Sequence, residues 1–335
     1  MAVSGSSVEE DHAIVIGIER YLDGSALAPL QGARSDAQRF YRWVTARDGG
    51  AVSRGNATLV APPPGRPRDA VLRELKRAFV DLGRRGTGKG YIGRRLYIYL
   101  AGHGIAQNRE EASLYAADGG PRTPHRHIPG WCYASWFMYA AYFREVVLFA
   151  DCCRTEYRDL PVQSFPLDPV NSPSAGSAVW VRGFAVKYGQ SALEIGAKKS
   201  SGIFTSALLD ALRHAYRKGQ ITARSVEAYL HNHPKLAKVR GVQESSFVVG
   251  EGDVVFKERA PRRLPTTRVY LEVKGDAAPT VEGGPPDGTW QVRRTRRARR
   301  YIVDLPAGIY AAKLSGRTWR YFEVSGEGSK HVRQK

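Results

Sequence analysis

The chain has 335 residues, of which 42% are hydrophobic and 25% charged, a composition typical of a globular protein with room for one large domain and a smaller one. Three cysteines occur, two of them adjacent, so no disulfide framework is expected and a reducing compartment is indicated. The N-terminal residues do not have the pattern of a signal peptide, and no apolar run approaches the ~18 residues that span a bilayer. We therefore expect a soluble, cytoplasmic protein that does not contact a membrane.

Strand and helix patterns alternate through the first part of the chain. Strands are predicted at residues 12–19, 57–61, 96–101, 146–154, 178–188 and 246–250, with a short extended piece at 113–118, and helices at 32–46, 68–83, 131–143, 203–217 and 222–233. This alternation predicts an α/β fold with a mostly parallel sheet and helices on both faces. Four prolines mark residues 155–177 as a long loop, and loops of that length are usually functional or cleavable.

A second, smaller domain is predicted after this region. Residues 257–265 (KERAPRRLP) are predicted to link a domain at 1–256 to one at 266–335. In the latter, apolar residues alternate with a period of two, which predicts a small all-β module, a sandwich. Six arginines lie in the eight residues from Arg293 to Arg300. This run is either a solvated hairpin surface or a nucleic-acid contact, consistent with a net charge of +19.

Chemistry-bearing residues follow two of the most apolar strands. The strand at 96–101 is followed by Gly102, His103 and Gly104, and the strand at 146–154 carries Asp151, Cys152 and Cys153 at its C-terminal edge. Ligands bind outside the carboxyl ends of strands in open α/β sheets, so a thiol and an imidazole are expected at one edge. A thiolate nucleophile with a histidine base is a recurring arrangement for acyl transfer. The backbone N–H groups of Gly104 and Cys153 are the predicted oxyanion donors.

The segments YLAGHG and FADCCR resemble the caspase-fold cysteine peptidases, and more narrowly the metacaspases and their bacterial (orthocaspase) branch. His103 precedes Cys153 by an interval close to the roughly 50 residues of caspases. Residues 30–37, 184–194 and 202–212 also resemble parts of this family, so the resemblance covers residues 12–256. It implies a caspase-like sheet, Cys153 as nucleophile, His103 as base and Cys152 as a packed neighbour.

The resemblance also implies a specificity pocket built from acids. By position these acids are Asp36 and Asp151, and a carboxylate pair binds arginine bidentately and lysine as a point charge. Cleavage after Arg or Lys is therefore expected. The backbone of the substrate is expected to pair with an extended segment at 185–190, with Tyr188 and Gln190 as substrate-binding residues.

A protease of this specificity in a basic chain has candidate cleavage sites in its own sequence. The predicted self-cleavage sites, which flank the long loop, are Arg154, Arg158 and Arg182. Calcium-dependent metacaspases carry a cluster of acids, of which Asp118 and Asp159 would supply two, but the rest are not found. Neither a metal site nor a cofactor is therefore expected, and zymogen cleavage or a regulatory partner is the expected switch.

The sequence departs from the family at two positions near the site. Ala101 stands where metacaspases usually have serine, and Thr155 where many relatives have glycine. The leading hypothesis is a cysteine endopeptidase acting on protein substrates, controlled by an activating protease or regulator, with bacterial cell death or antiviral defence as the context implied by the resemblance. One alternative is a basic adaptor whose caspase-like domain is a scaffold for nucleic acid or protein partners. A second is another enzyme of related fold, such as a transamidase or a ligase.

Overall fold

The computed structural model describes residues 11–22, 25–87, 91–157, 163–168, 178–192, 194–195, 201–258, 266–273, 278–284, 290–295, 299–315, 318–324 and 330–333. The chain divides into two compact units, Met1–Ser206 with Val239–Val254, and Ala207–Lys238 with Val255–Lys335. The domain boundary at 257–265 stays a prediction. Lys257 and Glu258 belong to a strand, and residues 259–265 lie outside the described part of the chain.

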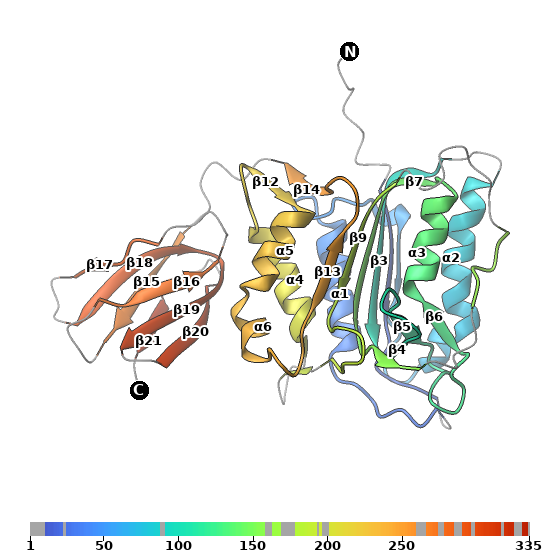
Figure 1. Ribbon diagram of the computed structural model, residues 1–335, viewed down its shortest axis with the longest axis horizontal. Helices are drawn as coiled ribbons and strands as arrows, with labels where there is room; N and C mark the ends of the chain where they lie inside the picture. Colours follow the sequence, from blue (N-terminus) through green and yellow to red (C-terminus); the bar gives the residue numbers. More distant parts are fainter. Residues whose placement is uncertain are drawn as a thin grey trace, which may run out of the picture. The chain divides into compact units, whose positions relative to one another are not determined.

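A six-stranded sheet forms the centre of the first unit (Figure 1). Its order is β13 (Ser246–Val249), β9 (Val179–Phe184), β7 (Phe143–Cys152), β3 (Gly93–Gly102), β1 (His12–Gly17) and β2 (Ala57–Val60). All neighbours are parallel except β13, which is antiparallel to β9. The central strands β1, β3 and β7 are apolar and almost wholly buried, as expected for strands covered on both faces. The predicted mixed α/β fold with a mostly parallel sheet is confirmed.

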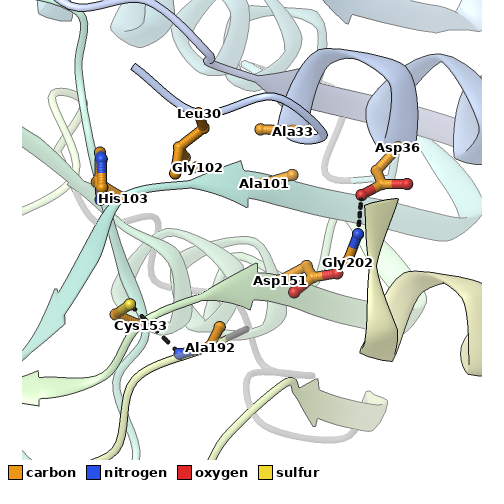
Figure 2. Close-up of a pocket in the computed structure, with 10 residues that line it drawn as sticks. All are labelled: Leu30, Ala33, Asp36, Ala101, Gly102, His103, Asp151, Cys153, Ala192 and Gly202. Atoms are coloured by element: carbon orange, nitrogen blue, oxygen red, sulfur yellow. Dashed lines mark hydrogen bonds between the residues drawn. The ribbon is translucent and has the colours of Figure 1, made fainter. Parts of the chain in front are cut away.

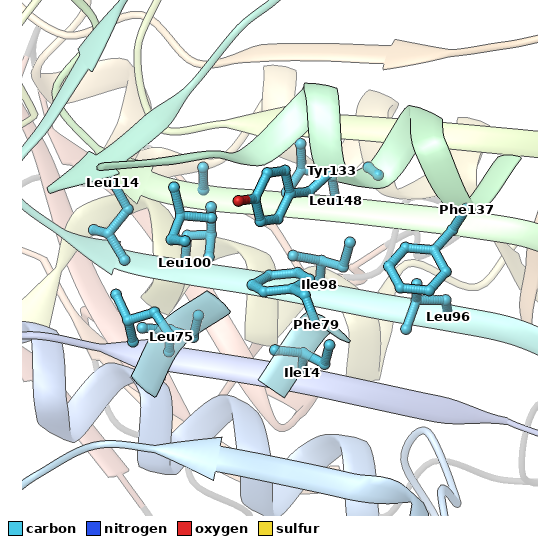
Figure 3. Close-up of a cluster of buried hydrophobic side chains, with 14 of the residues drawn as sticks. Ile14, Leu75, Phe79, Leu96, Ile98, Leu100, Leu114, Tyr133, Phe137 and Leu148 are labelled. Carbon is cyan, nitrogen blue, oxygen red and sulfur yellow. The ribbon is translucent and has the colours of Figure 1, made fainter. Parts of the chain in front are cut away.

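Helices cover both faces of this sheet (Figure 1). Helix α1 (Ala33–Thr45) lies on one face, where Phe40 stacks on Tyr99 of β3 with ring centroids 4.4 Å apart. Helices α2 (Leu72–Gly86) and α3 (Gly130–Tyr139) lie on the other face. Their side chains form one core with the sheet, which includes Ile14, Phe79, Leu96, Ile98, Tyr133, Phe137 and Leu148 (Figure 3). Burial of this apolar surface supplies the main driving force that holds the layers together.

Short elements follow the carboxyl ends of β3 and β7. A small sheet contains β6 (His127–Pro129), β5 (Ser113–Tyr115), β4 (Gly104–Ala106) and β8 (Thr155–Glu156). Strand β10 (Glu194–Ile195) pairs with β11 (Ser201–Gly202), which leads directly into α4 (Ile203–His214). Two 3-10 turns, Arg54–Asn56 and Pro67–Ala70, precede β2 and α2.

The second unit holds the predicted all-β region. One sheet has the order β17 (Arg293–Arg294), β18 (Arg300–Pro306), β15 (Thr266–Glu272) and β21 (Lys330–Arg333), and the other β16 (Thr280–Gly283), β19 (Gly308–Ser315) and β20 (Thr318–Val324). Both contribute to one core, for example through Leu271 and Val303 of the first and Tyr310 and Val324 of the second. The unit also contains α5 (Ala223–His231), α6 (Pro234–Lys238) and the pair β12 (Gln220–Thr222) and β14 (Val255–Glu258). Across the described residues, no helix is long and apolar enough to cross a membrane.

Candidate active site

The two strands that carry the thiol and the imidazole are neighbours in the sheet. In the parallel register of β3 and β7, Gly102 lies opposite Cys152, so His103 and Cys153 follow at the same edge. Both side chains line one cavity (Figure 2). The backbone at Gly104 comes so close to the cysteine turn that an added Cβ would lie 2.7 Å from the Cys152 Sγ and 2.6 Å from the carbonyl oxygen of Cys153. A glycine at 104 therefore permits this close approach of the two strand ends.

The imidazole of His103 is oriented by the main chain. Its Nε2 lies 2.8 Å from the carbonyl oxygen of Ala28. A carbonyl only accepts hydrogen bonds, so Nε2 carries the hydrogen and Nδ1 keeps the lone pair that a general base needs. The backbone N–H of His103 donates to the Tyr21 hydroxyl at 2.8 Å, and the two rings are 5.1 Å apart. Tyr21 and Ala28 together fix the position and the tautomer of this histidine.

The two adjacent cysteines differ in environment. Cys152 is 1% exposed, and burial raises the pKa of its thiol far above the ordinary value. Cys153 is only partly buried and lines the cavity, and its Sγ accepts a hydrogen bond of 3.3 Å from the Ala192 N–H. The position of the Sγ beside a backbone donor and at the strand edge suits a nucleophile, whereas Cys152 is a core residue.

The cavity runs from this Cys–His pair to a pair of acids. It has a volume of about 80 Å³ and is lined by Leu30, Ala33, Asp36, Ala101, Gly102, His103, Asp151, Cys153, Ala192 and Gly202. Figure 2 shows His103 and Cys153 at one end and Asp36 and Asp151 at the other. A side chain that enters beside the thiol would therefore extend along small and apolar residues toward two carboxylates.

Both acids are buried, and they accept hydrogen bonds from the last residue of β11 and from the first turn of α4. Asp36 is 2% exposed, accepts 2.6 Å from the Gly202 N–H and pairs with Arg39 at 3.0 Å. Asp151 accepts from the N–H of Thr205 at 3.0 Å and from its hydroxyl at 2.5 Å. Carboxylates are favourable at a helix N-terminus, where N–H groups lack partners within the helix. Burial, and then the charge on Asp151, raises the pKa of Asp36 to about 7.

Gly202 makes this arrangement possible. A Cβ at this position would lie 1.9 Å from the Asp151 Oδ2, which no real contact allows. The close packing of β11 on β7 and α1 therefore requires glycine at residue 202. The sequence gives no signal for this requirement, because the residues that meet here are far apart in the chain.

The predicted self-cleavage sites lie in very different surroundings. Arg154 is 1% exposed and donates hydrogen bonds to three main-chain carbonyls, so its side chain is not available as a cleavage signal in the folded protein. Arg182 lies within β9, which is paired on both sides, and its guanidinium stacks over Trp131 and Trp180. Self-cleavage at Arg154 and Arg182 stays a prediction that would require local unfolding, and Arg158 lies outside the described residues.

The predicted substrate-binding segment is a turn rather than a strand. Strand β9 ends at Phe184, and Gly189 has a φ of +84°. Within the turn, Gln190 accepts the Arg154 N–H at its backbone oxygen, and its side-chain oxygen accepts the N–H groups of Lys187 and Glu244. The expectation of an extended segment at 185–190 is therefore wrong. Binding of substrate by Tyr188 and Gln190 stays a prediction.

Other predicted positions have structural partners. Asp118 accepts the N–H of Leu72 at the start of α2 and pairs with Arg126 at 2.6 Å, while Asp159 lies outside the described residues. In the described part of the chain, no group of three or more His, Cys, Asp or Glu side chains has the arrangement of a metal site. Of the arginine-rich run, Arg293 pairs with Asp304 and Arg300 with Glu272, and residues 296–298 are not described.

Sequence reasoning missed three contacts of the Cys–His pair. They are the Ala28 carbonyl, the Tyr21 hydroxyl and the Ala192 N–H. Two of these are main-chain groups that every residue possesses, so no residue type marks them. The arrangement as a whole, a thiol and an oriented imidazole beside two carboxylates, has the groups that acyl transfer requires.

Comparison with known proteins finds a relative by sequence. No family model matches the chain. The chain is 27% identical over 224 residues to a protein named "Probable protease" from a Desulfuromonadales bacterium. The match covers 61% of this chain and 26% of the relative, so the chain matches about a quarter of that protein's length.

Two solved structures are also similar. Caspase-1 from Spodoptera frugiperda has a TM-score of 0.49 and 13% identity over 76% of this chain and 94% of its own. Protein GSU0716 from Geobacter sulfurreducens has a TM-score of 0.47 and 14% identity over 72% and 93% of the two chains.

Proposed function

We propose that the protein is a cysteine endopeptidase of the caspase-like class that cleaves protein substrates after arginine or lysine. The observation that carries the proposal is the single cavity with Cys153 and His103 at one end and Asp36 and Asp151 at the other. The 27% identity to a protein named a probable protease supports peptidase activity. The motifs around His103 and Cys153 support the caspase-like class.

Acylation begins at the thiol. The Sγ of Cys153 attacks the carbonyl carbon of the scissile bond while Nδ1 of His103 takes the thiol proton. The C–N bond then breaks, and Nδ1 returns the proton to the leaving amine, which leaves a thioester on Cys153. Water attacks the thioester with His103 as base, and the acid product and the free thiol are released. The N–H groups of Gly104 and Cys153 are the proposed donors to the tetrahedral oxyanion.

Recognition depends on charge at the far end of the cavity. Arg39 already pairs with Asp36, so the two acids and Arg39 together carry one negative charge when both acids are ionised. One substrate cation neutralises this excess, and a guanidinium can donate to both carboxylates at once. A substrate aspartate would instead add a third negative charge to a buried site, which is strongly unfavourable.

Control by an activating protease or a regulatory partner is part of the proposal. The loop that the sequence marks as cleavable is packed where it is described, with Phe165 stacked on Trp136 at 4.0 Å. Arg158 remains the proposed cleavage position in this loop. A role in bacterial cell death or antiviral defence rests on the family resemblance alone.

Fluorogenic peptides that end in Arg, Lys or Asp test the function directly. We expect cleavage after Arg and Lys, none after Asp, and loss of activity in Cys153→Ala and His103→Ala. Cys132→Ala is the matched control, because Cys132 is also a partly buried free thiol but lies on α3, outside the cavity.

Cleavage that persists in Cys153→Ala would overturn the nucleophile assignment. Preference for Asp would overturn the acidic pocket. If the protein is inactive on all three peptides both untreated and after limited treatment with trypsin that is then inhibited, the peptidase proposal fails.

A further inference from the structure

We propose that Arg154 is a positioning residue for the nucleophile Cys153. It fixes Cys153 relative to two segments, the connection between β4 and β5 and the turn after β9 that leads to Ala192. The inference rests on the proposed peptidase function. Arg154 follows Cys153 directly, so any displacement of its backbone moves the thiol. Its side chain does not line the cavity and is buried in the protein, with 1% of its surface exposed.

The guanidinium joins two separate segments. Its Nε donates to the carbonyl oxygen of Glu111 at 2.9 Å, and its Nη2 to that of Arg109 at 2.5 Å. Both carbonyls belong to the connection between β4 and β5, the strands that follow His103. Its Nη1 donates to the carbonyl oxygen of Val186 at 3.2 Å, in the turn after β9. One side chain therefore links the segment downstream of the base to the turn after β9.

The backbone of Arg154 extends this link to the thiol. Its N–H donates to the carbonyl of Gln190 at 3.0 Å, and its carbonyl accepts the Gly189 N–H at 2.9 Å. Two residues after Gln190, the N–H of Ala192 donates to the Sγ of Cys153. The donor to the nucleophile is thus placed by a turn that is held at both ends by Arg154.

The chemistry of arginine suits this role and that of lysine does not. The side chain uses three N–H groups of a planar fork toward three carbonyls, and its cation lies 4.4 Å from the centre of the Phe184 ring. The neighbouring Glu111 carboxylate instead accepts the N–H groups of Trp131 and Cys132 at the start of α3. Burial lowers the pKa of Arg154 to about 10, so the side chain stays charged at neutral pH. An ammonium could reach fewer of the three carbonyls.

The test compares Arg154→Lys with Arg95→Lys in the full chain. Arg95 is equally buried, at 1% exposure, and lies in the first half of β3. It pairs with Glu145 of β7 and does not line the cavity. Both variants are expected to lower the unfolding temperature. Only Arg154→Lys is expected to lower kcat on the Arg peptide, by roughly tenfold or more, and to change the rate at which iodoacetamide alkylates Cys153, read by mass spectrometry. Wild-type values of both in Arg154→Lys would overturn the proposal.

Phe184→Leu is a second variant that leaves the arginine in place. This substitution removes the aromatic face under the guanidinium but keeps an apolar side chain. It should lower kcat by roughly threefold, a smaller effect than that of Arg154→Lys. If Arg154→Lys does not fold, unchanged kcat and alkylation in a folded Phe184→Leu would overturn the proposal. The alkylation readout needs no substrate. A wild-type protein that cleaves no peptide before or after limited trypsin treatment would therefore overturn the proposed function, while the alkylation rates would still decide the role of Arg154.

Discussion

Asp36 and Asp151 line the same end of one cavity, and burial together with the charge on Asp151 raises the pKa of Asp36 to about 7. The negative charges of two buried carboxylates repel each other, and a cation between them relieves this repulsion. The site is therefore less stable when empty and ionised than when a basic side chain occupies it.

Replacing Asp36 by Asn tests both consequences. We expect kcat/KM for Arg peptides to fall by roughly 10- to 100-fold, because a charge-assisted contact to substrate is lost. The wild-type carboxyl ionises near pH 4 when unfolded but near pH 7 when folded, so wild type loses stability as pH rises across this window. The free energy of unfolding of the variant relative to wild type should therefore increase from pH 4 to pH 7 in chemical denaturation. A pH-independent difference would contradict the assigned shift.

Gly202→Ala should damage the pocket without touching the Cys–His pair. The added Cβ would overlap the Asp151 Oδ2, so β11 or the carboxylate must move. We expect the KM for Arg peptides to rise by about tenfold or more. Gly55→Ala is the control, because a Cβ there meets nothing within 4 Å. Equal KM values in the two variants would argue against the pocket.

Tyr21→Phe removes one hydroxyl that accepts the His103 N–H and donates to the Ile18 carbonyl. The ring and its contact with the imidazole remain. We expect kcat to fall by roughly 3- to 10-fold with little change in KM, because the base is held less firmly. Steady-state kinetics beside Tyr139→Phe, an exposed tyrosine on α3, checks this, and equal kcat values in the two would contradict it.

His127 should make the fold sensitive to acid. It is fully buried, its Nδ1 lies 2.7 Å from the Pro124 carbonyl, and burial lowers its pKa to about 4. The folded state keeps the ring neutral while the unfolded state binds a proton below pH 6.5, so stability is lost as pH falls from 6.5 to 4. The size of this loss is about 3 kcal/mol at most. His127→Asn, whose amide can replace the Nδ1–H donor, should lose less stability over this range in urea titrations, and an equal loss would refute the assignment.

Local pattern and strand-end chemistry were enough to predict much of this protein. The apolar runs around Ile14, Ile98 and Leu148 predict buried parallel strands, because only a strand covered on both faces is apolar at every position. The glycines and polar residues that end two of these strands predict a thiol and an imidazole at one edge. The period-two pattern after residue 266 predicts the separate β region. These features depend on residues close together in the chain.

Tertiary structure alone decided the rest, because it depends on which distant segments meet. From the sequence, Arg154 is expected to be an exposed arginine beside a loop. In the structure it is buried and donates hydrogen bonds to three carbonyls from two other segments. The segment at 185–190 reads as strand, yet its hydrogen bonds to Arg154 and Glu244 make it a turn. The orientation of His103 depends on a carbonyl 75 residues away, and main-chain groups carry no mark in the sequence. The identities of the reactive side chains are local information, whereas the contacts that orient and bury them are not.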